Sequence, residues 1–375
     1  MKKEIFYWAP FFSNIATIKA VLNSAISIKK FSKNDFIPVI INVFGEWDEF
    51  KEKIKKYQIE IIELNLNKYF KKKKIQGFIR SRYYQIKIFI LAFFPLLNLI
   101  KSRKPDILIL HLITSLPLFL NSIFKIRSKI ILRISGLPKL NIIRKFFWHF
   151  VLRKANIITT PTIATKEHLQ KVFKKNNIRL LRDPILNLEK IKLKKILKEK
   201  NKKKFLAIGR LTKQKNFIFL LECFKILVEK NSKIYLYILG EGEESEKLIN
   251  FINKNNLQNN VFLEGYKSNV YEYLSNSDAF ILSSLWEDPG FVLVEAAFAN
   301  TTIISSNCSN GPSEILENGK NGFLFKSNDK KDFLEVFSKY QNTDTTMINQ
   351  KKLDSKKMSR KYSLLSHFSE LKKLF

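Results

Sequence analysis

The sequence predicts an α/β protein built from two doubly wound, Rossmann-like domains, and three observations support this fold class. Short runs of β-branched and aromatic residues alternate with longer amphipathic stretches, which is typical of buried parallel strands joined by helices. The alternation stops in a lysine- and leucine-rich stretch, residues 188–204, and then begins again. The chain has 375 residues, a length that usually forms two domains. We therefore expect domains over residues 1–190 and 200–350 that face each other across a cleft.

The first domain is expected to contain six strands with helices between them. Its strands are predicted over residues 5–8, 37–44, 59–64, 107–111, 129–134 and 156–160. Its helices are predicted over residues 15–30, 46–57, 78–101 and 144–153. Pro10 interrupts the apolar run at the N-terminus, so we interpret that run as a strand and not as a signal peptide.

The second domain is expected to repeat this arrangement after the lysine-rich stretch. Its strands are predicted over residues 205–209, 234–240, 261–265, 279–283, 302–306 and 322–325, and its helices over 216–230, 245–255, 269–275 and 291–299. Apolar residues recur at roughly helical spacing over 356–375. We expect this stretch to form a final amphipathic helix that packs back on the first domain.

The formal net charge of +34 is distributed unevenly along the chain. Residues 1–200 hold 42 Lys and Arg against 13 Asp and Glu, whereas residues 201–375 hold 25 against 20. A genomic bias toward lysine would raise the charge of both halves alike. The asymmetry therefore suggests that the first half docks on an anionic membrane surface, where four consecutive lysines, 71–74, precede an aromatic and apolar stretch, 78–100.

The cysteine content and the length of the apolar runs bear on where in the cell the protein is found. Two cysteines, Cys223 and Cys308, provide no disulfide framework, which favours a reducing environment. The longest apolar run, residues 88–100, contains Pro95 and Asn98 and is shorter than the roughly 20 residues that a spanning helix needs. We expect a cytoplasmic protein that is peripheral on the inner face of the cell membrane.

Glycine is scarce and clusters in one region. Of 11 glycines, eight lie between residues 209 and 322. Gly209, Gly240 and Gly265 each follow a predicted strand, which places them at the carboxyl edge of one sheet, where open α/β sheets bind ligands. Ordinary strand-to-loop turns would also account for each of them singly.

Two charged motifs follow predicted strands of the second domain. Arg210 and Lys215 stand just before a helix, where a guanidinium, an ammonium and the helix dipole suit a diphosphate; a solvated basic loop is the alternative. Glu287 and Glu295 are separated by seven residues, and Gly290 lies at the expected start of a helix. Carboxylates accept hydrogen bonds and therefore suit sugar hydroxyls, although Glu295 could be structural and Glu287 a helix cap.

Several motifs in this region carry a family resemblance. They are Gly209-Arg210-Leu211-x(3)-Lys215-Asn216, Leu239-Gly240-Glu241-Gly242-Glu243, Phe262-Leu263-Glu264-Gly265-Tyr266, Glu287-x(7)-Glu295, and Gly311-Pro312-Ser313-Glu314-Ile315 with Asn318-Gly319-x-Asn321-Gly322. In this order they resemble the donor half of retaining family-4 glycosyltransferases of the GT-B fold. The resemblance is close over residues 203–326, and the ordered set is specific although each motif alone is weak.

The resemblance implies a role for each matching residue. Arg210 and Lys215 match the pair that binds the donor diphosphate and stabilises the leaving group. Glu287 matches the residue that binds donor-sugar hydroxyls, and Glu295 matches the one that binds the ribose. Further donor-binding positions are the nucleobase contact Tyr266, the backbone N–H groups of Phe291 and Val292, and the glycines Gly209 and Gly290. The chain departs from the family's Glu-Gly-Phe-Gly opening, because it reads Glu287-Asp288-Pro289-Gly290.

The first domain resembles the family more loosely. The strand that ends in His111 resembles the one that the family aims into the cleft, so His111 is a candidate for orienting a sugar; a buried structural histidine is the alternative. The family's glycine-rich loop after the first strand is replaced by a glycine-free loop, in which Ser13 and Asn14 could cap the next helix and offer hydrogen-bond donors. Acceptor recognition should therefore differ from that of glycine-loop members.

Together these features predict a retaining glycosyltransferase that needs neither a metal ion nor a cofactor. The donor is expected to be a UDP- or GDP-linked hexose or N-acetylhexosamine, and the acceptor a lipid-linked glycan or a cell-surface polysaccharide precursor. A GT-B nucleotide-sugar epimerase is the nearest alternative. A basic nucleic-acid-binding protein is a further alternative, but no known nucleic-acid-binding motif is present.

Overall fold

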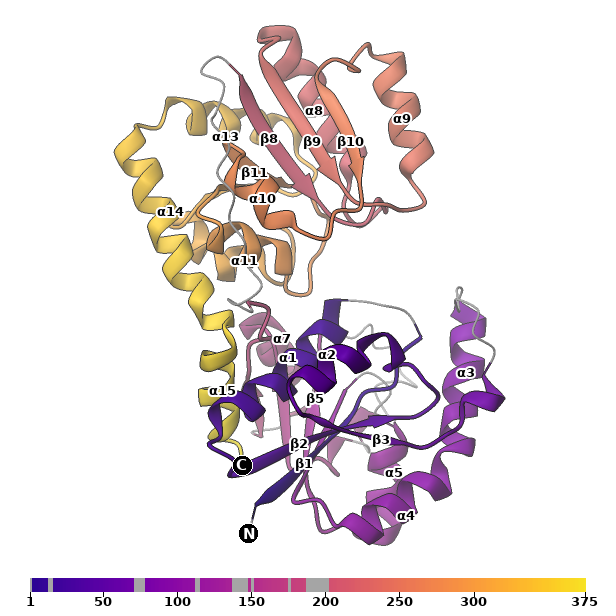
Figure 1. Cartoon of the computed structure of the whole chain (residues 1–375). Coiled ribbons are helices and arrows are strands. Elements are labelled where there is room, and N and C mark those ends of the chain that lie inside the picture. The colour runs from indigo at the N-terminus through magenta and orange to yellow at the C-terminus, as the bar shows by residue number, and fades with distance from the viewer. Residues whose placement is uncertain are drawn as a thin grey trace. The chain divides into compact units, whose positions relative to one another are not determined.

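The computed structural model describes residues 2–12, 16–70, 78–111, 115–136, 148–149, 152–174, 177–186 and 202–375. The chain divides into two compact units (Figure 1). The first unit comprises Met1–Ile185 with Tyr362–Phe375, and the second comprises Leu186–Lys361. Each unit has its own parallel sheet with helices on both faces, so the α/β, doubly wound fold class is confirmed.

The first unit contains a seven-stranded parallel sheet of order β3-β2-β1-β4-β5-β6-β7. The strands are β1 (Lys3–Trp8), β2 (Phe36–Asn42), β3 (Glu60–Glu63), β4 (Ile107–Leu110), β5 (Lys129–Arg133), β6 (Ile157–Thr160) and β7 (Ile178–Leu180). Its helices are α1 (Ala16–Phe31), α2 (Lys51–Lys56), α3 (Phe78–Leu91), α4 (Phe93–Arg103), α5 (Ser115–Phe124), α7 (Ile163–Phe173) and α15 (Leu364–Lys372). The strand order reverses between β1 and β4, which is where ligands bind in such sheets.

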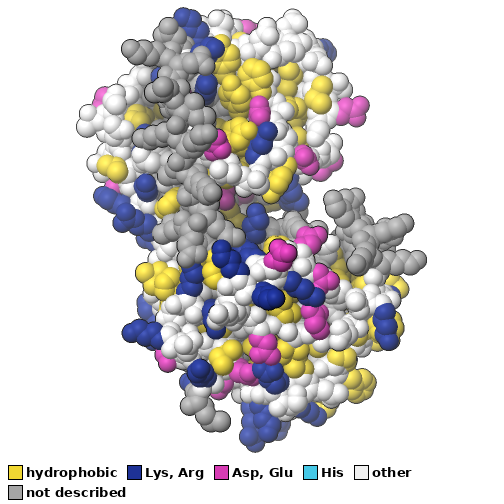
Figure 2. Space-filling view, in the orientation of Figure 1, with side chains coloured by type: hydrophobic (Ala, Val, Ile, Leu, Met, Phe, Trp, Pro, Cys, Tyr) yellow, Lys and Arg dark blue, Asp and Glu magenta, His cyan; other side chains and the backbone are white. Residues whose placement is uncertain are grey.

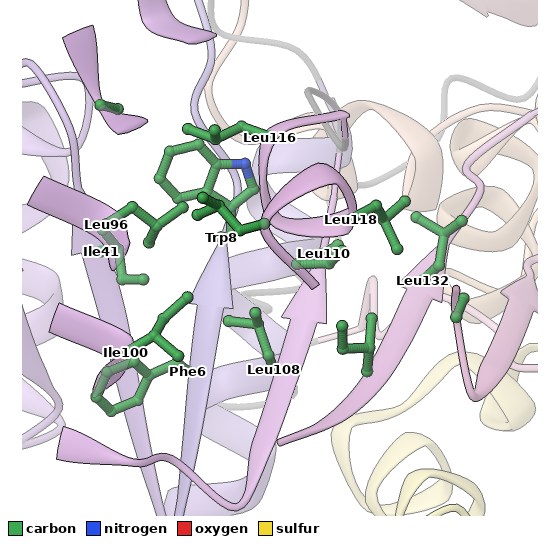
Figure 3. Packing of buried hydrophobic residues seen from close by; sticks show 14 of the residues in the cluster. Phe6, Trp8, Ile41, Leu96, Ile100, Leu108, Leu110, Leu116, Leu118 and Leu132 are labelled. Atoms are coloured by element: carbon green, nitrogen blue, oxygen red, sulfur yellow. The ribbon is translucent and has the colours of Figure 1, made fainter. Parts of the chain in front are cut away.

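Both faces of this sheet are buried, because alternate residues of each strand point to opposite sides. Phe6 and Trp8 of β1 pack with α4 and α5 on one face (Figure 3). Ile5 and Tyr7 pack on the other face with α1, α2 and α15. The C-terminal helix α15 contributes Leu364, Phe368 and Leu371 to this second core, so the end of the chain belongs to the first unit.

The second unit contains a six-stranded parallel sheet of order β10-β9-β8-β11-β12-β13. The strands are β8 (Lys203–Ile208), β9 (Ile234–Leu239), β10 (Val261–Gly265), β11 (Ala279–Leu282), β12 (Thr302–Ser306) and β13 (Phe323–Phe325). Its helices are α8 (Phe217–Lys230), α9 (Ser245–Lys254), α10 (Val270–Ser275), α11 (Phe291–Phe298), α12 (Pro312–Ile315), α13 (Lys330–Asn342) and α14 (Thr345–Ser359). The order reverses between β8 and β11, so the loops after these two strands meet at the switch point.

Two predicted helices are wrong in extent. The helix predicted over 78–101 is divided into α3 and α4, and Pro95 lies in the first turn of α4, where its missing N–H costs no helical hydrogen bond. The helix predicted over 356–375 is interrupted because α14 ends at Ser359 and Ser363 caps α15, its side chain accepting a hydrogen bond from the N–H of Ser366. The predicted helix 144–153 falls mostly outside the described residues.

Candidate active site

The loops after β8 and β11 are joined at the switch point of the second unit. The backbone N–H of Leu285 donates to the carbonyl of Gln214 at 2.8 Å. The Ser283 hydroxyl donates to the carbonyl of Lys215 at 2.8 Å. The Gln214 side chain returns a bond to the carbonyl of Trp286 at 2.9 Å. These hydrogen bonds hold the two loops together at the carboxyl edge of the sheet, although Gln214 and Trp286 lie 72 positions apart in the sequence.

At this edge Lys215 and Glu287 form an ion pair. The Lys215 Nζ lies 2.5 Å from Glu287 Oε1, and their side chains are only 13% and 5% exposed. The Ser284 hydroxyl donates to the same carboxylate oxygen at 2.5 Å. The structure therefore brings together two of the predicted site residues, and it adds Ser284, which the sequence analysis did not single out.

The strand ends approach so closely here that side chains are excluded. A Cβ on Gly240 would lie 1.9 Å from the carbonyl oxygen of Gly209, which is a distance that no real Cβ adopts. The N–H of Gly240 donates to the carbonyl of Gly265 at 2.8 Å. All three glycines therefore lie at the carboxyl edge of this sheet, as their positions after predicted strands indicated.

Helix α11 begins beside Glu287. Gly290 precedes the helix with a φ of 91°, a left-handed conformation that favours glycine. Phe291 and Val292 form the first turn, whose N–H groups have no partner within the helix. Glu295 lies one turn further on and is partly buried; burial and then the charge of Glu295 raise the pKa of the Tyr271 phenol.

The other two predicted donor contacts are exposed. Arg210 follows Gly209 at the end of β8, and its side chain is exposed. It forms no ion pair with another described residue. Tyr266 follows Gly265 at the end of β10 and is 66% exposed. Both side chains are accessible at the same edge of the sheet, and the structure leaves their roles as predictions.

His111 lies at the switch point of the first unit, where its backbone N–H donates to the backbone carbonyl of Trp8 at 2.8 Å. The imidazole is 2% exposed and stacks on the Tyr7 ring at 6.2 Å between centroids. Among the described residues neither ring nitrogen has a hydrogen-bond partner. Burial, assisted by the Arg133 charge, lowers the pKa of His111 well below its usual value, so the ring is neutral. Ser13 and Asn14, the other predicted residues of this unit, lie outside the described residues.

A buried polar row extends from His111 across the sheet. Leu110 pairs with Leu132, and Arg133 pairs with Thr159. His111, which directly follows β4, is therefore a lateral neighbour of Arg133 on β5 and of Thr159 on β6. Arg133 forms an ion pair with Asp183, and their side chains are 3% and 1% exposed. The sequence analysis missed Arg133 and Asp183. The one available signal was a guanidinium within an otherwise apolar strand end, residues 130–134.

A chain of three hydrogen bonds connects this region to the C-terminal helix. His367 Nδ1 lies 2.7 Å from the carbonyl oxygen of Arg182, which can only accept, so Nδ1 carries the proton. His367 Nε2 therefore accepts from the Ser24 hydroxyl at 2.8 Å, and Ser24 accepts from the Tyr7 hydroxyl at 2.9 Å. Burial and then the Arg133 charge lower the pKa of His367 to about 3, which keeps this arrangement neutral.

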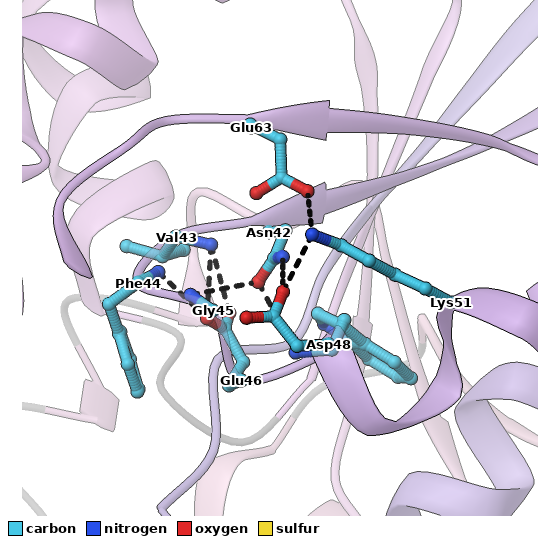
Figure 4. A network of polar contacts seen from close by, with 9 residues as sticks. Asn42, Val43, Phe44, Gly45, Glu46, Asp48, Lys51 and Glu63 are labelled. Atoms are coloured by element: carbon cyan, nitrogen blue, oxygen red, sulfur yellow. Dashed lines mark hydrogen bonds and ion pairs between the residues drawn. The ribbon is translucent and has the colours of Figure 1, made fainter. Parts of the chain in front are cut away.

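The loop after β2 is also fixed by polar contacts at the carboxyl edge (Figure 4). The buried carboxylate of Glu46 accepts backbone N–H bonds from Val43 at 3.1 Å and Phe44 at 2.8 Å. Burial nevertheless raises its pKa to about 7. Next to it, Lys51 bridges Asp48 at 2.8 Å and Glu63 at 3.0 Å. The loop is therefore rigidly attached to the strands that it connects.

Comparison with known proteins gives consistent results. Residues 189–355 match the model of the family described as glycosyl transferases group 1. An uncharacterized glycosyltransferase of Methanocaldococcus jannaschii is 35% identical over 246 residues, or 60% of this chain and 61% of that protein. An Escherichia coli protein named UDP-Gal:α-D-GlcNAc-diphosphoundecaprenol α-1,3-galactosyltransferase is 31% identical over 44% of this chain and 43% of its own length. The chain thus spans less than two thirds of the length of each of these two relatives.

The solved structures that the chain resembles establish the fold. Staphylococcus aureus TarM, crystallised with UDP and α-GlcNAc-glycerol, superposes with a TM-score of 0.75 at 17% identity, covering 100% of this chain and 99% of TarM. The chain therefore has the GT-B fold. Part of its sequence, including residues 189–355, is similar to glycosyltransferases. Within the described ranges no three His, Cys, Asp or Glu side chains gather in a way that could hold a metal ion.

Proposed function

We propose that the protein is a retaining glycosyltransferase that moves a hexose or N-acetylhexosamine from a nucleoside diphosphate to a lipid-linked glycan or polysaccharide precursor. The observation that carries this proposal is the Lys215–Glu287 pair at the switch point of the second sheet, beside the first turn of α11, where Phe291 and Val292 have no N–H partner within the helix. The E. coli relative is named for a UDP-sugar donor and a diphosphoundecaprenol-linked acceptor, and TarM was crystallised with UDP, which supports the same classes here.

In the proposed reaction, the bond between the anomeric carbon and the β-phosphate oxygen breaks as the acceptor oxygen attacks from the same face. The acceptor proton passes to an oxygen of the departing diphosphate, and the electron pair of the broken bond remains on that diphosphate. Lys215, Arg210 and the first N–H groups of α11 would stabilise the charge that develops there. Lys215 and the N–H groups of α11 would act with little reorganisation, because the ion pair with Glu287 and the helix already hold them in place.

The geometry of the ion pair is compatible with separate roles for the two residues, in which Glu287 binds a sugar hydroxyl and Lys215 binds the diphosphate. The Ser284 hydroxyl and the Lys215 ammonium bind the same oxygen of Glu287, so the carboxylate has its second oxygen available for a sugar hydroxyl. Binding of a diphosphate would give the ammonium a second anionic partner. On the acceptor side, a neutral His111 can donate from one ring nitrogen and accept at the other, which suits a hydroxyl and not a phosphate.

The epimerase alternative is not favoured, because the curated relatives with assigned reactions are named as transferases. The two activities also differ in products. A transferase consumes donor in proportion to acceptor, whereas an epimerase releases sugar or its epimer without any acceptor.

A thermal-shift screen of nucleotide sugars tests the donor site. A ligand that binds only the native state raises the unfolding temperature by mass action, so the correct donor should give the largest shift. Lys215→Ala should reduce that shift, whereas Lys213→Ala, an exposed lysine of the same loop, should leave it unchanged. Equal shifts in both variants would contradict the assigned site, and the absence of a shift with every UDP- and GDP-sugar would contradict the proposed donor class.

A further inference from the structure

Helices α3 and α4 have an outward face that is apolar. Tyr83, Ile86, Ile90 and Phe94 are 58%, 61%, 65% and 68% exposed. Their spacing of three, four and four residues places them in one stripe along the helices. A helix on the surface of a soluble domain normally presents polar side chains on that side.

The inward faces of the same helices are apolar as well. Ile88 and Ala92 are fully buried, and Leu96 and Ile100 of α4 pack on the sheet next to Phe6 (Figure 3). These side chains anchor the helices in the core of the first unit. Helices that are apolar on both sides have a partner on the outer side as well as on the inner one.

Helix α5 extends the apolar stripe into a surface. Phe119, Ile123 and Phe124 are 42%, 53% and 39% exposed. Phe119 contacts Phe89 of α3 at 5.3 Å between ring centroids, and Phe124 contacts Phe93 of α4 at 6.3 Å. We call this surface the α3–α5 face; it consists of Tyr83, Ile86, Ile90, Phe94, Phe119, Ile123 and Phe124, which are seven of the 15 exposed large hydrophobic side chains in the described ranges.

Basic side chains of α3 and α4, Lys87 beside Tyr83 and Lys101 beside Phe124, lie against the α3–α5 face, and acidic residues are nearly absent from this part of the sequence. Asp106 is the one acidic residue between Glu63 and Glu167, a stretch that contains 21 Lys and Arg. Asp106 is engaged by the N–H of Glu4 at 2.8 Å. Within the face, Lys101 lies 4.8 Å from the centroid of the Phe124 ring. Hydrophobic and basic side chains lie side by side where α3 and α4 form the edge of the first unit (Figure 2).

The combination of apolar and basic side chains on the α3–α5 face favours an anionic lipid surface over a second copy of this chain as its partner. A second copy of this chain would bring basic side chains opposite basic ones without acidic residues to pair them, which opposes symmetric association. An anionic lipid surface supplies both an apolar phase for the aromatic and aliphatic side chains and phosphates for the lysines. Lysine stems can lie along the apolar surface while their ammonium groups reach the headgroups.

The helices are suited to lie on a bilayer and not to cross it. Among the described residues no single helix is long and apolar enough to span a membrane, and only the pair Arg82–Leu91 and Phe93–Arg103, bent by 49°, meets that test together. The inner side chains of this pair belong to the core of the unit, so crossing would require the unit to unfold.

We propose that the α3–α5 face docks the protein on an anionic bilayer, with its aromatic and aliphatic side chains inserted at headgroup level and Lys87 and Lys101 at the lipid phosphates. This partner is the surface on which a lipid-linked acceptor of the proposed reaction would be presented. The docking itself does not depend on glycosyl transfer, so the two proposals are tested separately.

Co-sedimentation of the full chain with vesicles tests the docking surface. Vesicles of phosphatidylcholine with about 30 mol% phosphatidylglycerol should bind the protein, and vesicles of phosphatidylcholine alone should bind it much less. The double variant Ile90→Glu with Phe94→Glu should weaken binding at least about tenfold, because two charges would enter the apolar layer. The matched control is Ile249→Glu on α9, which is 47% exposed and lies outside the face.

The outcomes separate the proposal from its competitors. Equal loss of binding in the control and in the double variant, or binding that is insensitive to the anionic lipid and to about 0.5 M salt, would overturn it. A wild-type dimer that the double variant converts to a monomer, without vesicle binding by either, would show that a second copy covers the face. Thermal unfolding confirms that the variants fold. Turnover on a water-soluble acceptor should be unchanged in the double variant, so loss of docking is distinguishable from loss of the reaction.

Discussion

The two units have the same architecture but use their switch points differently. In the second unit the charged groups at the switch point, Lys215 and Glu287, form a pair in partly accessible loops. In the first unit the switch point holds a neutral, buried His111, and the nearby charged pair, Arg133 at the end of β5 and Asp183 after β7, is buried as well. A parallel sheet thus places polar groups at its carboxyl edge in both cases. Burial decides whether they are available for chemistry or mainly hold the structure.

The largest expected effect on stability comes from the buried pair of the first unit. Asp183→Ala should lower the free energy of unfolding by about 3–5 kcal/mol, because it leaves the Arg133 charge buried and unpaired. The double variant Arg133→Met with Asp183→Leu should recover most of this loss. Urea unfolding measures both, and Lys215→Ala in the second unit should cost less because that pair is more exposed. A double variant as unstable as the single one would contradict this interpretation.

Glu46 should make the stability of the first unit depend on pH in an unusual direction. Its folded pKa is raised from 4.5 to about 7, so the folded state binds the proton more tightly than the unfolded state does. The contribution of Glu46 to the free energy of unfolding is fully present below pH 4.5 and is lost as the pH rises through about 7. Relative to wild type, Glu46→Gln should therefore gain up to about 3 kcal/mol between these limits. Chemical denaturation of both proteins across this pH range measures the difference between their free energies of unfolding. A difference that does not change with pH would contradict a raised pKa of Glu46.

His367 should act in the opposite direction. Its folded pKa is lowered from 6.5 to about 3, so the unfolded state takes up the proton first and stability falls as the pH drops below 6.5. By about pH 5 the loss of unfolding free energy from His367 should reach about 2 kcal/mol, and His367→Gln should remove this contribution while that of His111 remains. Stability of the variant that follows the wild-type pH profile would exclude His367 as the source. His111 is expected to contribute in the same direction.

The smallest effect is expected at the amino edge of the first sheet. Arg103 pairs with Glu4 at 2.5 Å and with Glu60 at 2.9 Å, but the guanidinium is 36% exposed. Arg103→Ala should cost no more than about 1 kcal/mol, because solvent screens such pairs. A loss as large as that of Asp183→Ala would mean that exposure does not distinguish the two pairs.

The sequence predicts the strands of the second unit better than those of the first for a physical reason. Strands β8 to β13 are continuous apolar runs bounded by glycine or polar turns, and β12 was predicted with its observed bounds. In the first unit β7 has only three residues, Ile178–Leu180, and α5 follows β4 without a local stop signal that distinguishes it. Neither element was predicted, and helices α7, α13 and α14 were not predicted either.

The polar row of the first unit illustrates a second limit. Arg133 and Asp183 are 50 residues apart, and their pairing depends on the register of three strands, β5 to β7, and on the loop after β7. Local spacing carries no information about register. Lys215 and Glu287 lie 72 residues apart and were both predicted as site residues because they stand in recognisable motifs, although their ion pair was not predicted. Membrane docking by the basic half stays a prediction, and the exposed stripe on α3 could not be found from the sequence without knowledge of which helix face is buried.

The central claim is that the switch point of the second unit binds and activates a nucleotide-sugar donor. Transfer of labelled sugar from the donor that the thermal-shift screen identifies, measured as turnover, tests it most directly. Lys215→Ala and Glu287→Ala should each reduce turnover by about 10²–10³ while the protein stays folded, and Lys213→Ala should retain wild-type turnover. Wild-type turnover in Lys215→Ala and Glu287→Ala would contradict the account.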